Sequence, residues 1–155
     1  MAEVIPFRGL VYRPTAALGQ ESRDASSLLA PPYDVIGEAE RRSLAGQSAF
    51  NSVHLILPQP PVGAEGDARY AVAGATLLAW QRGQVVTRDE QPAFYRYHQV
   101  FSPPGEPSAA KVVRRGFIAR IRLHRFAEGV ILPHERTLSG PKVDRLKLKR
   151  GTRTH

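Results

Sequence analysis

The stretch that decides the fold class is Ala93-Phe94-Tyr95-Arg96-Tyr97-His98-Gln99-Val100-Phe101, a run rich in aromatic residues in which apolar and polar positions alternate. A Pro- and Gly-containing loop follows at Ser102–Pro107, and the alternation resumes from Val112 to Leu123. Two such runs joined by a loop predict a long β-hairpin. We expect one face of the second strand to lie in the core, namely Val113, Phe117, Ala119, Ile121 and Leu123. The opposite face is basic, with Arg114, Arg120, Arg122 and His124.

Helical patterns precede the hairpin. Residues 37–46 predict a short surface helix that has acidic residues in its first turn and Gly46 at its end. Residues 67–82 predict an amphipathic helix ended by Gly83, with a core stripe formed by Tyr70, Ala73, Leu77 and Trp80. Asn51–Leu57 predicts a strand that ends at Pro58. The expected fold is therefore α+β: a mixed β-sheet with a long hairpin, packed against a few helices and covered on one face by the helix at 67–82.

Composition narrows the class of protein. A chain of 155 residues suits a single domain over residues 1–155, and 42% hydrophobic residues exclude a disordered chain. The absence of Cys excludes disulfides and thiolate chemistry. The N-terminus lacks the apolar segment of an export signal, and the longest weakly polar run, Tyr70–Trp80, is too short to cross a membrane. We expect a cytoplasmic protein that does not enter the membrane.

Charge is distributed unevenly along the chain. The formal net charge is +8, with −2 over residues 1–77 and +10 over residues 78–155. A basic half of this kind attracts phosphate groups, whether these belong to a nucleic acid, a nucleotide or a small metabolite. Charge alone does not distinguish among these partners.

The densest polar cluster is Pro133–Arg145, where an apolar run leads into a loop and then a helix. Pro141 is predicted at the first helical position, with Ser139 or Gly140 as the cap. The free N–H groups at such a helix start, together with nearby hydroxyls and cations, predict a phosphate-binding site. The predicted phosphate-binding residues are Arg136, Thr137, Ser139, Gly140, Lys142 and Arg145. His134 and Glu135 are candidates for general acid–base catalysis. No metal site is predicted, because the zincin pattern needs a second His at position 138, which is Leu.

Two simpler interpretations of the basic half stay open. The cluster can be an ordinary polar loop in which Glu135 pairs with Arg136 or Lys142. Alternatively, the basic half is a nucleic-acid-binding or protein-interaction module without catalysis, using cations such as Arg114, Arg120 and Arg122. No aromatic residue lies between the basic residues from 136 to 153, which weakens a base-stacking mode there.

Five stretches of the chain, in order, resemble a bacterial and archaeal family of unknown function, domain-of-unknown-function family 1015. They are Pro6-Phe7-Arg8-Gly9-Leu10, Ala30-Pro31-Pro32-Tyr33-Asp34-Val35-Ile36, Leu55-Ile56-Leu57-Pro58, Arg115-Gly116-Phe117-Ile118 and Leu132-Pro133-His134-Glu135-Arg136-Thr137-Leu138-Ser139-Gly140-Pro141-Lys142-Val143-Asp144-Arg145. Members of that family are longer, so the resemblance implies that this chain corresponds to the N-terminal portion of a longer domain, with the remainder as its partner.

The resemblance also implies a function. Longer members carry an Asp-Gly-His-His-Arg motif similar to that of free-serine kinases of the ParB/sulfiredoxin superfamily, and they often neighbour serine-biosynthesis genes. This implies phosphoryl transfer to a small hydroxylated metabolite, with ATP, ADP or pyrophosphate as the donor, together with Mg²⁺. The present chain contains no Asp-Gly-His-His-Arg motif, so we expect a binding site for a phosphorylated or hydroxylated metabolite and no catalysis by these 155 residues alone.

Overall fold

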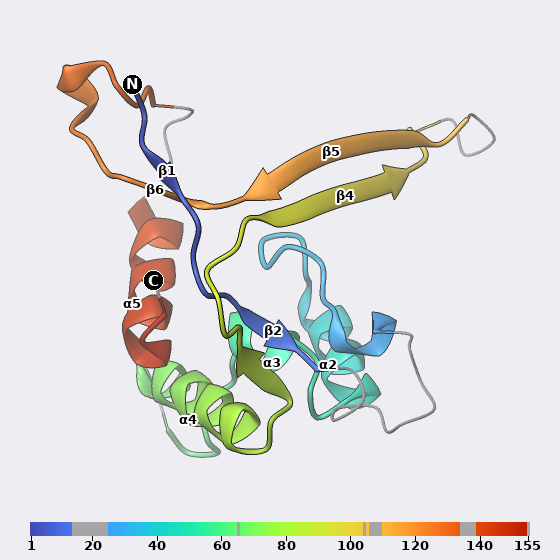
Figure 1. The fold of residues 1–155 in the computed structure, drawn as a ribbon. Helices are drawn as coiled ribbons and strands as arrows, with labels where there is room; N and C mark the ends of the chain where they lie inside the picture. Colours follow the sequence, from blue (N-terminus) through green and yellow to red (C-terminus); the bar gives the residue numbers. More distant parts are fainter. Residues whose placement is uncertain (14–24, 65, 104, 106–109, 134–138, 155) are drawn as a thin grey trace. The chain divides into compact units, whose positions relative to one another are not determined.

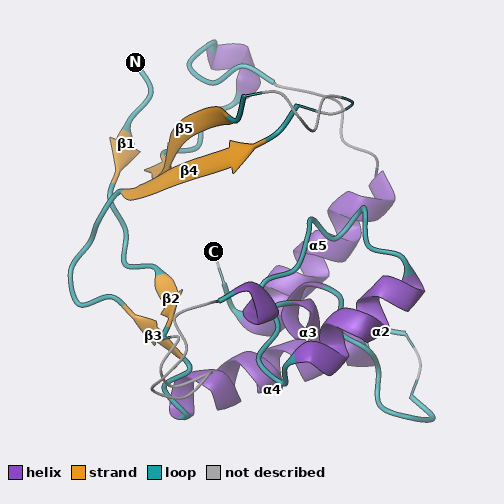
Figure 2. Cartoon of the chain, turned by 90° about the vertical axis from the view of Figure 1, so that its right-hand side faces the viewer, coloured by secondary structure: helices purple, strands orange, loops and turns teal. Residues whose placement is uncertain are grey.

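The chain divides into two compact units in a computed structural model. The structure describes residues 1–13, 25–64, 66–103, 105, 110–133 and 139–154. The sheet unit comprises Met1–Leu10 and Arg88–Glu135, and the helical unit comprises Val11–Thr87 and Arg136–His155. Figures 1 and 2 show the elements of both units. Each unit is therefore discontinuous in sequence, and the helical unit joins the middle of the chain to its C-terminal helix.

The helical unit is built on α4 (Ala68–Arg82) and α5 (Ser139–Thr152), which pack against each other. The predicted stripe on α4 is confirmed, because Tyr70, Ala73, Leu77 and Trp80 are all buried. α4 also contacts α3 (Val53–Ile56), and the Trp80 ring lies about 6 Å from the rings of Tyr12 and Phe50. The core face of α4 therefore packs against residues of its own unit.

Two predictions about short elements have different outcomes. The helix at 37–46 is confirmed as α2 (Glu38–Gln47), which contacts α3 and the 3-10 turn η1 (Ser26–Leu28). The strand predicted over Asn51–Leu57 is wrong, because α3 occupies that stretch. The reason lies in Asn51, which is fully buried. Its amide donates to the carbonyl oxygens of Ser27 and Leu29, and its Oδ1 accepts the N–H of Val53. These tertiary contacts favour a helical start over the local β propensity.

The sheet unit begins with an N-terminal segment that pairs with distant strands. β1 (Val4–Ile5) pairs antiparallel with β6 (Arg120–Ile121), and Phe7 forms a β-bridge with Ala93. The Tyr95 hydroxyl accepts the N–H of Gly9 at 2.7 Å and donates to Asp89 Oδ2 at 2.6 Å. A Cβ at position 9 would lie 2.8 Å from that hydroxyl oxygen, so the close approach of Tyr95 requires glycine.

The predicted long hairpin is confirmed in the sheet unit. β4 (Tyr95–Phe101) pairs antiparallel with β5 (Val112–Ile118) in unbroken register from Tyr95↔Ile118 to Phe101↔Val112. The predicted core face of the second strand is wrong, because every residue of β5 is exposed. Ile121 and Leu123 are exposed as well. Within the sheet unit, the described residues provide only the 3-10 turn η2 (Phe126–Glu128) as a helix, which is too short to cover a sheet face.

The α+β class predicted from the sequence is confirmed. The described strands form three two-stranded sheets, since β2 (Leu10–Tyr12) pairs with β3 (Val86–Arg88) in addition to the β1–β6 and β4–β5 pairs. All buried hydrophobic residues of the described chain lie in the helical unit. No helix among the described residues is long and apolar enough to span a membrane.

Candidate anion-binding pocket

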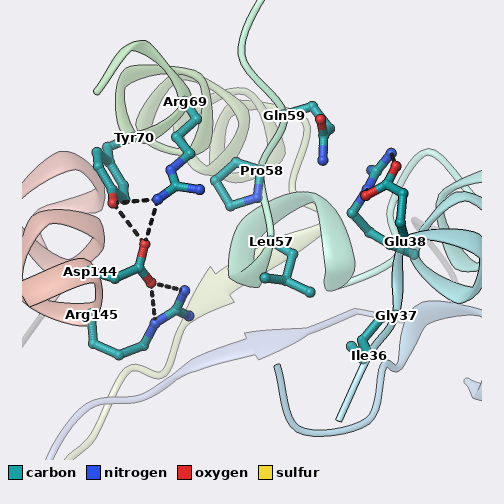
Figure 3. Close-up of a pocket in the computed structure, with 11 residues that line it drawn as sticks. Ile36, Gly37, Glu38, Leu57, Pro58, Gln59, Arg69, Tyr70, Asp144 and Arg145 are labelled. Carbon is teal, nitrogen blue, oxygen red and sulfur yellow. Dashed lines mark hydrogen bonds and ion pairs between the residues drawn. The ribbon is translucent and has the colours of Figure 1, made fainter. Parts of the chain in front are cut away.

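A pocket of about 210 Å³ lies within the helical unit, where α4, α5, α2 and the residues after α3 meet. Figure 3 shows the side chains that border it. Three of them are arginines, Arg41, Arg69 and Arg145, and two are carboxylates, Glu38 and Asp144. The other lining residues are Ile36, Gly37, Leu57, Pro58, Gln59 and Tyr70. The pocket therefore has one more positive than negative side chain.

Asp144 in the second turn of α5 is the centre of a hydrogen-bond network. Its Oδ1 accepts the Tyr70 hydroxyl at 2.7 Å and Arg69 Nη2 at 2.9 Å. Its Oδ2 accepts Arg145 Nε at 2.8 Å and also Arg145 Nη2. Both oxygens are thus bonded by donors from α4 and α5, as the dashed lines in Figure 3 show.

The network fixes the charge of Asp144. Partial burial acts to raise the pKa of this carboxyl, but hydrogen bonds from Tyr70 and Arg145 and the positive charges of Arg145 and Arg69 outweigh it, so the pKa lies below its ordinary value. The pKa of Arg69 is raised, chiefly by its hydrogen bond to the Tyr70 hydroxyl. Asp144 is therefore a carboxylate with occupied oxygens and is unsuited to act as a general base.

Arg145 ties three segments together. Its Nη1 donates to the Ile56 carbonyl oxygen at 2.9 Å, and its guanidinium carbon lies 3.9 Å from the centre of the Tyr33 ring. With the bonds to Asp144, the planar guanidinium is engaged along its edge and on one face. It thus connects α5 to the end of α3 and to the Pro-Pro-Tyr turn.

Three of the stretches that carry the family resemblance meet at this site. Tyr33 and Ile36 come from the stretch 30–36, Leu57 and Pro58 from the stretch 55–58, and Asp144 with Arg145 from the stretch 132–145. Ile36 and Asp144, from the outer two of these stretches, are separated by more than 100 positions in the sequence. The α4–α5 packing is what places the last stretch beside the others.

The predicted site residues fall into three groups. His134, Glu135, Arg136 and Thr137 lie outside the described residues. Ser139, Gly140 and Lys142 are exposed in the first turn of α5. The helix begins at Ser139, so Pro141 is its third residue, whereas the sequence predicted Pro141 as the first residue and Ser139 or Gly140 as the cap. Arg145 borders the pocket, but its guanidinium is held by the contacts above. The structure therefore adds a pocket next to the predicted helix start.

Sequence reasoning missed six polar pocket residues, namely Glu38, Arg41, Gln59, Arg69, Tyr70 and Asp144. Tyr70 was assigned to the core stripe of its helix, which is correct for its ring, whereas its hydroxyl reaches Asp144. Arg69 directly precedes Tyr70 in the sequence, and no motif around it indicated a binding site. Only the docking of α5 on α4 reveals that both side chains face the last family stretch.

The residues of the pocket do not fit a magnesium ion. Among the described residues, the carboxylates that border it are Glu38, which pairs with Arg41 at 3.3 Å, and Asp144, whose oxygens are occupied. Over the part of the chain that the structure describes, no group of three or more His, Cys, Asp or Glu side chains could hold a metal. The described lining of the pocket is more basic than acidic.

The fold and the site define an α+β protein with an arginine-bordered pocket. The chain belongs to the family described as "Protein of unknown function (DUF1015)", whose model matches residues 4–155. No curated protein matches the chain. No solved structure matches it either.

Proposed function

We propose that this chain forms the small-metabolite-binding part of a phosphoryl-transfer enzyme and that the pocket beside Arg69 takes the anionic group of the ligand. The observation that carries the proposal is the meeting of three arginines from three segments at one pocket of about 210 Å³. Pockets for drug-sized ligands have about 300–1,000 Å³. The smaller volume here favours a metabolite the size of a hydroxylated amino or carboxylic acid.

Arg69 is the side chain that we expect to bind the anion. Its contacts to Tyr70 and Asp144 both use Nη2, and its side chain is 45% exposed. A guanidinium has five N–H donors, and those on Nε and Nη1 take no part in these two contacts. They can form the paired hydrogen bonds that a carboxylate or phosphate accepts.

The reaction class rests on the family resemblance. It implies transfer of a phosphoryl group from ATP, ADP or pyrophosphate to a small hydroxylated metabolite. His134 and Glu135 are the proposed acid–base residues, and Arg136, Thr137, Ser139, Gly140 and Lys142 the proposed phosphate-binding residues of the donor side. We expect turnover only where a segment with the Asp-Gly-His-His-Arg motif completes the enzyme, and we expect it in the cytoplasm, where nucleotide donors are abundant.

Calorimetry on the chain tests the pocket. Inorganic phosphate, pyrophosphate, ATP and serine are titrated into the wild-type protein, into Arg69→Ala and into Arg82→Ala. Arg82 is the matched control, since it is an exposed arginine on the same helix that does not border the pocket. We expect Arg69→Ala to weaken binding about ten-fold, the range of a charge-assisted hydrogen bond, and Arg82→Ala to leave it unchanged. Equal affinities of the two variants would contradict the proposal.

Turnover tests the catalytic assignment. The test uses a complete enzyme of this family in which the residue equivalent to His134 is replaced by Ala. We expect this substitution to lower kcat and to leave substrate affinity unchanged, as for a group that transfers a proton. If that variant kept full turnover, the polar cluster Pro133–Arg145 would have no catalytic role and would be an ordinary polar loop.

A further inference from the structure

The hairpin β4–β5 presents a face that combines aromatic rings with cations. Directly opposed residues of an antiparallel pair point to the same side, so the register Arg96↔Phe117, His98↔Arg115 and Val100↔Val113 defines this face. Phe94 precedes β4 and contacts the Phe117 ring edge-on, at 6.3 Å between centroids and 87° between planes. We call this set the Phe94 face: Phe94, Arg96, His98, Val100, Val113, Arg115 and Phe117.

The aromatic rings of the Phe94 face are unusually accessible. Phe94 is 52% and Phe117 65% exposed, and Val100 and Val113 beside them are also exposed. Large apolar side chains that gather in one exposed patch mark an interaction surface. Figure 1 shows β4 and β5 as a long two-stranded ribbon.

Charge indicates what the surface binds. Residues 93–122 contain six Lys or Arg side chains and one acidic side chain. On the opposite face of the hairpin, Arg114 stacks on Phe101 and bonds to Gln99. On the Phe94 face, Arg96 and Arg115 are exposed, and no described carboxylate pairs with either of them. The complementary partner is therefore a polyanion.

We propose that the Phe94 face binds single-stranded nucleic acid, with bases stacked on Phe94 and Phe117 and phosphates bound by Arg96 and Arg115. Exposed aromatic rings on a β-surface flanked by cations are the combination that stacks unpaired bases and holds their backbone. A duplex keeps its bases stacked on each other, so it offers these rings no base face. An acidic protein is less suited, since charged residues are depleted from the centres of protein interfaces.

The proposal is tested by fluorescence anisotropy with a labelled 20-nucleotide oligo-dT and with an abasic oligonucleotide of the same length. Both carry the same phosphates, but only oligo-dT has bases to stack. We expect the protein to bind oligo-dT at least ten-fold more tightly at 50 mM KCl and the affinity to fall steeply as salt rises. Equal binding of the two probes, or no binding of oligo-dT, would overturn the proposal.

Variants locate the interaction. Phe94→Ala combined with Phe117→Ala should lower the affinity for oligo-dT at least ten-fold, while Phe117→Trp should retain it because a ring remains. Arg96→Ala combined with Arg115→Ala should reduce the slope of log affinity against log salt by about 1.4, given about 0.7 per phosphate contact on a single strand. The control is Arg42→Ala combined with Arg82→Ala, which removes the same charge from exposed positions of the helical unit.

Two further measurements separate loss of binding from loss of folding and distinguish nucleic acid from an acidic protein. Circular dichroism checks that each variant keeps its strand signal, and the retained binding of Phe117→Trp separates loss of stacking from loss of the hairpin. Polyaspartate serves as a competitor: if it binds as tightly as oligo-dT and is weakened by the same variants, the face belongs to an acidic protein and the proposal fails. Arg69→Ala should bind oligo-dT normally, so the outcome is independent of the anion pocket.

Discussion

Gly74 and Gly151 face each other where α4 crosses α5. A Cβ on Gly74 would collide with the carbonyl oxygen of Gly151, and a Cβ on Gly151 would lie 2.5 Å from the carbonyl oxygen of Tyr70. The two helix backbones are therefore in direct contact, without side chains between them. This close crossing is what brings Asp144 on α5 within hydrogen-bond distance of Tyr70 on α4.

Gly74→Ala is expected to destabilise the protein although alanine is the better helix former. Overpacking a close contact costs about 1–3 kcal/mol, and here the obstacle is backbone that cannot rotate away, so we expect about 2 kcal/mol or more. Urea unfolding followed by circular dichroism measures the change. Gly46→Ala is the matched control, because a Cβ at this α2 position meets no atom within 4 Å. It should raise stability by about 0.5–1 kcal/mol; equal effects of the two substitutions would contradict the close crossing.

Arg145→Lys is expected to behave as a disruptive substitution. A lysine cannot bond Asp144 with two nitrogens, reach the Ile56 carbonyl oxygen and stack on Tyr33 at the same time. We expect a loss of about 2 kcal/mol in the free energy of unfolding, as for hydrogen bonds of charged groups. Arg150→Lys, an exposed position on the same helix, should change stability by less than about 0.5 kcal/mol. If both variants lost a similar amount of free energy of unfolding, Arg145 would not stabilise the contact between α5, α3 and the turn at Tyr33.

Asp144 should make stability depend on pH in the acid range. Its pKa is lower in the folded state than in the unfolded chain, so its contribution is fully present above the unfolded value of about 3.9 and is lost as pH falls through the folded value. We expect the difference in unfolding free energy between wild type and Asp144→Asn to be largest at pH 7 and to shrink below about pH 4.

Tyr70→Phe sharpens this test because it removes one donor to Asp144 and leaves the carboxyl in place. Its acid-range loss of stability should be smaller than that of the wild type. If the free energy of unfolding changed with pH in the same way for wild type, Asp144→Asn and Tyr70→Phe from pH 7 to pH 2, Asp144 would not be the source of the acid-range loss of stability.

Lys142→Ala tests the exposed start of α5 separately from the pocket. If the first turn binds the donor phosphates, this substitution should weaken pyrophosphate binding about ten-fold in calorimetry and leave the melting temperature unchanged. Lys149→Ala removes the same charge from an exposed position near the other end of the helix and is expected to have no effect. A loss of affinity in both variants alike would indicate general electrostatic attraction rather than a site.

Sequence patterns determined the elements with strong local periodicity. The apolar stripe at 67–82 corresponds to α4, and the alternation around 93–118 corresponds to the hairpin. Both follow from backbone geometry, because a helix repeats every 3.6 residues and a strand every 2. The same reasoning failed for residues 51–57, where the buried Asn51 overrides a local preference that is weak in so short a segment.

Tertiary structure alone decided which residues form the pocket and which apolar residues are buried. The sequence indicated Arg145 as a charged residue near a helix start, but its partners include the carbonyl of Ile56 at the end of α3 and the ring of Tyr33, and the neighbouring Asp144 is bonded by residues of α4. That meeting depends on two glycines 77 positions apart whose backbones touch, a relationship that no local pattern encodes. Likewise, the alternation in the hairpin determined which side chains share a face. Whether that face is buried depends on whether another layer covers it. Such covering results from packing between distant segments, which no local pattern encodes.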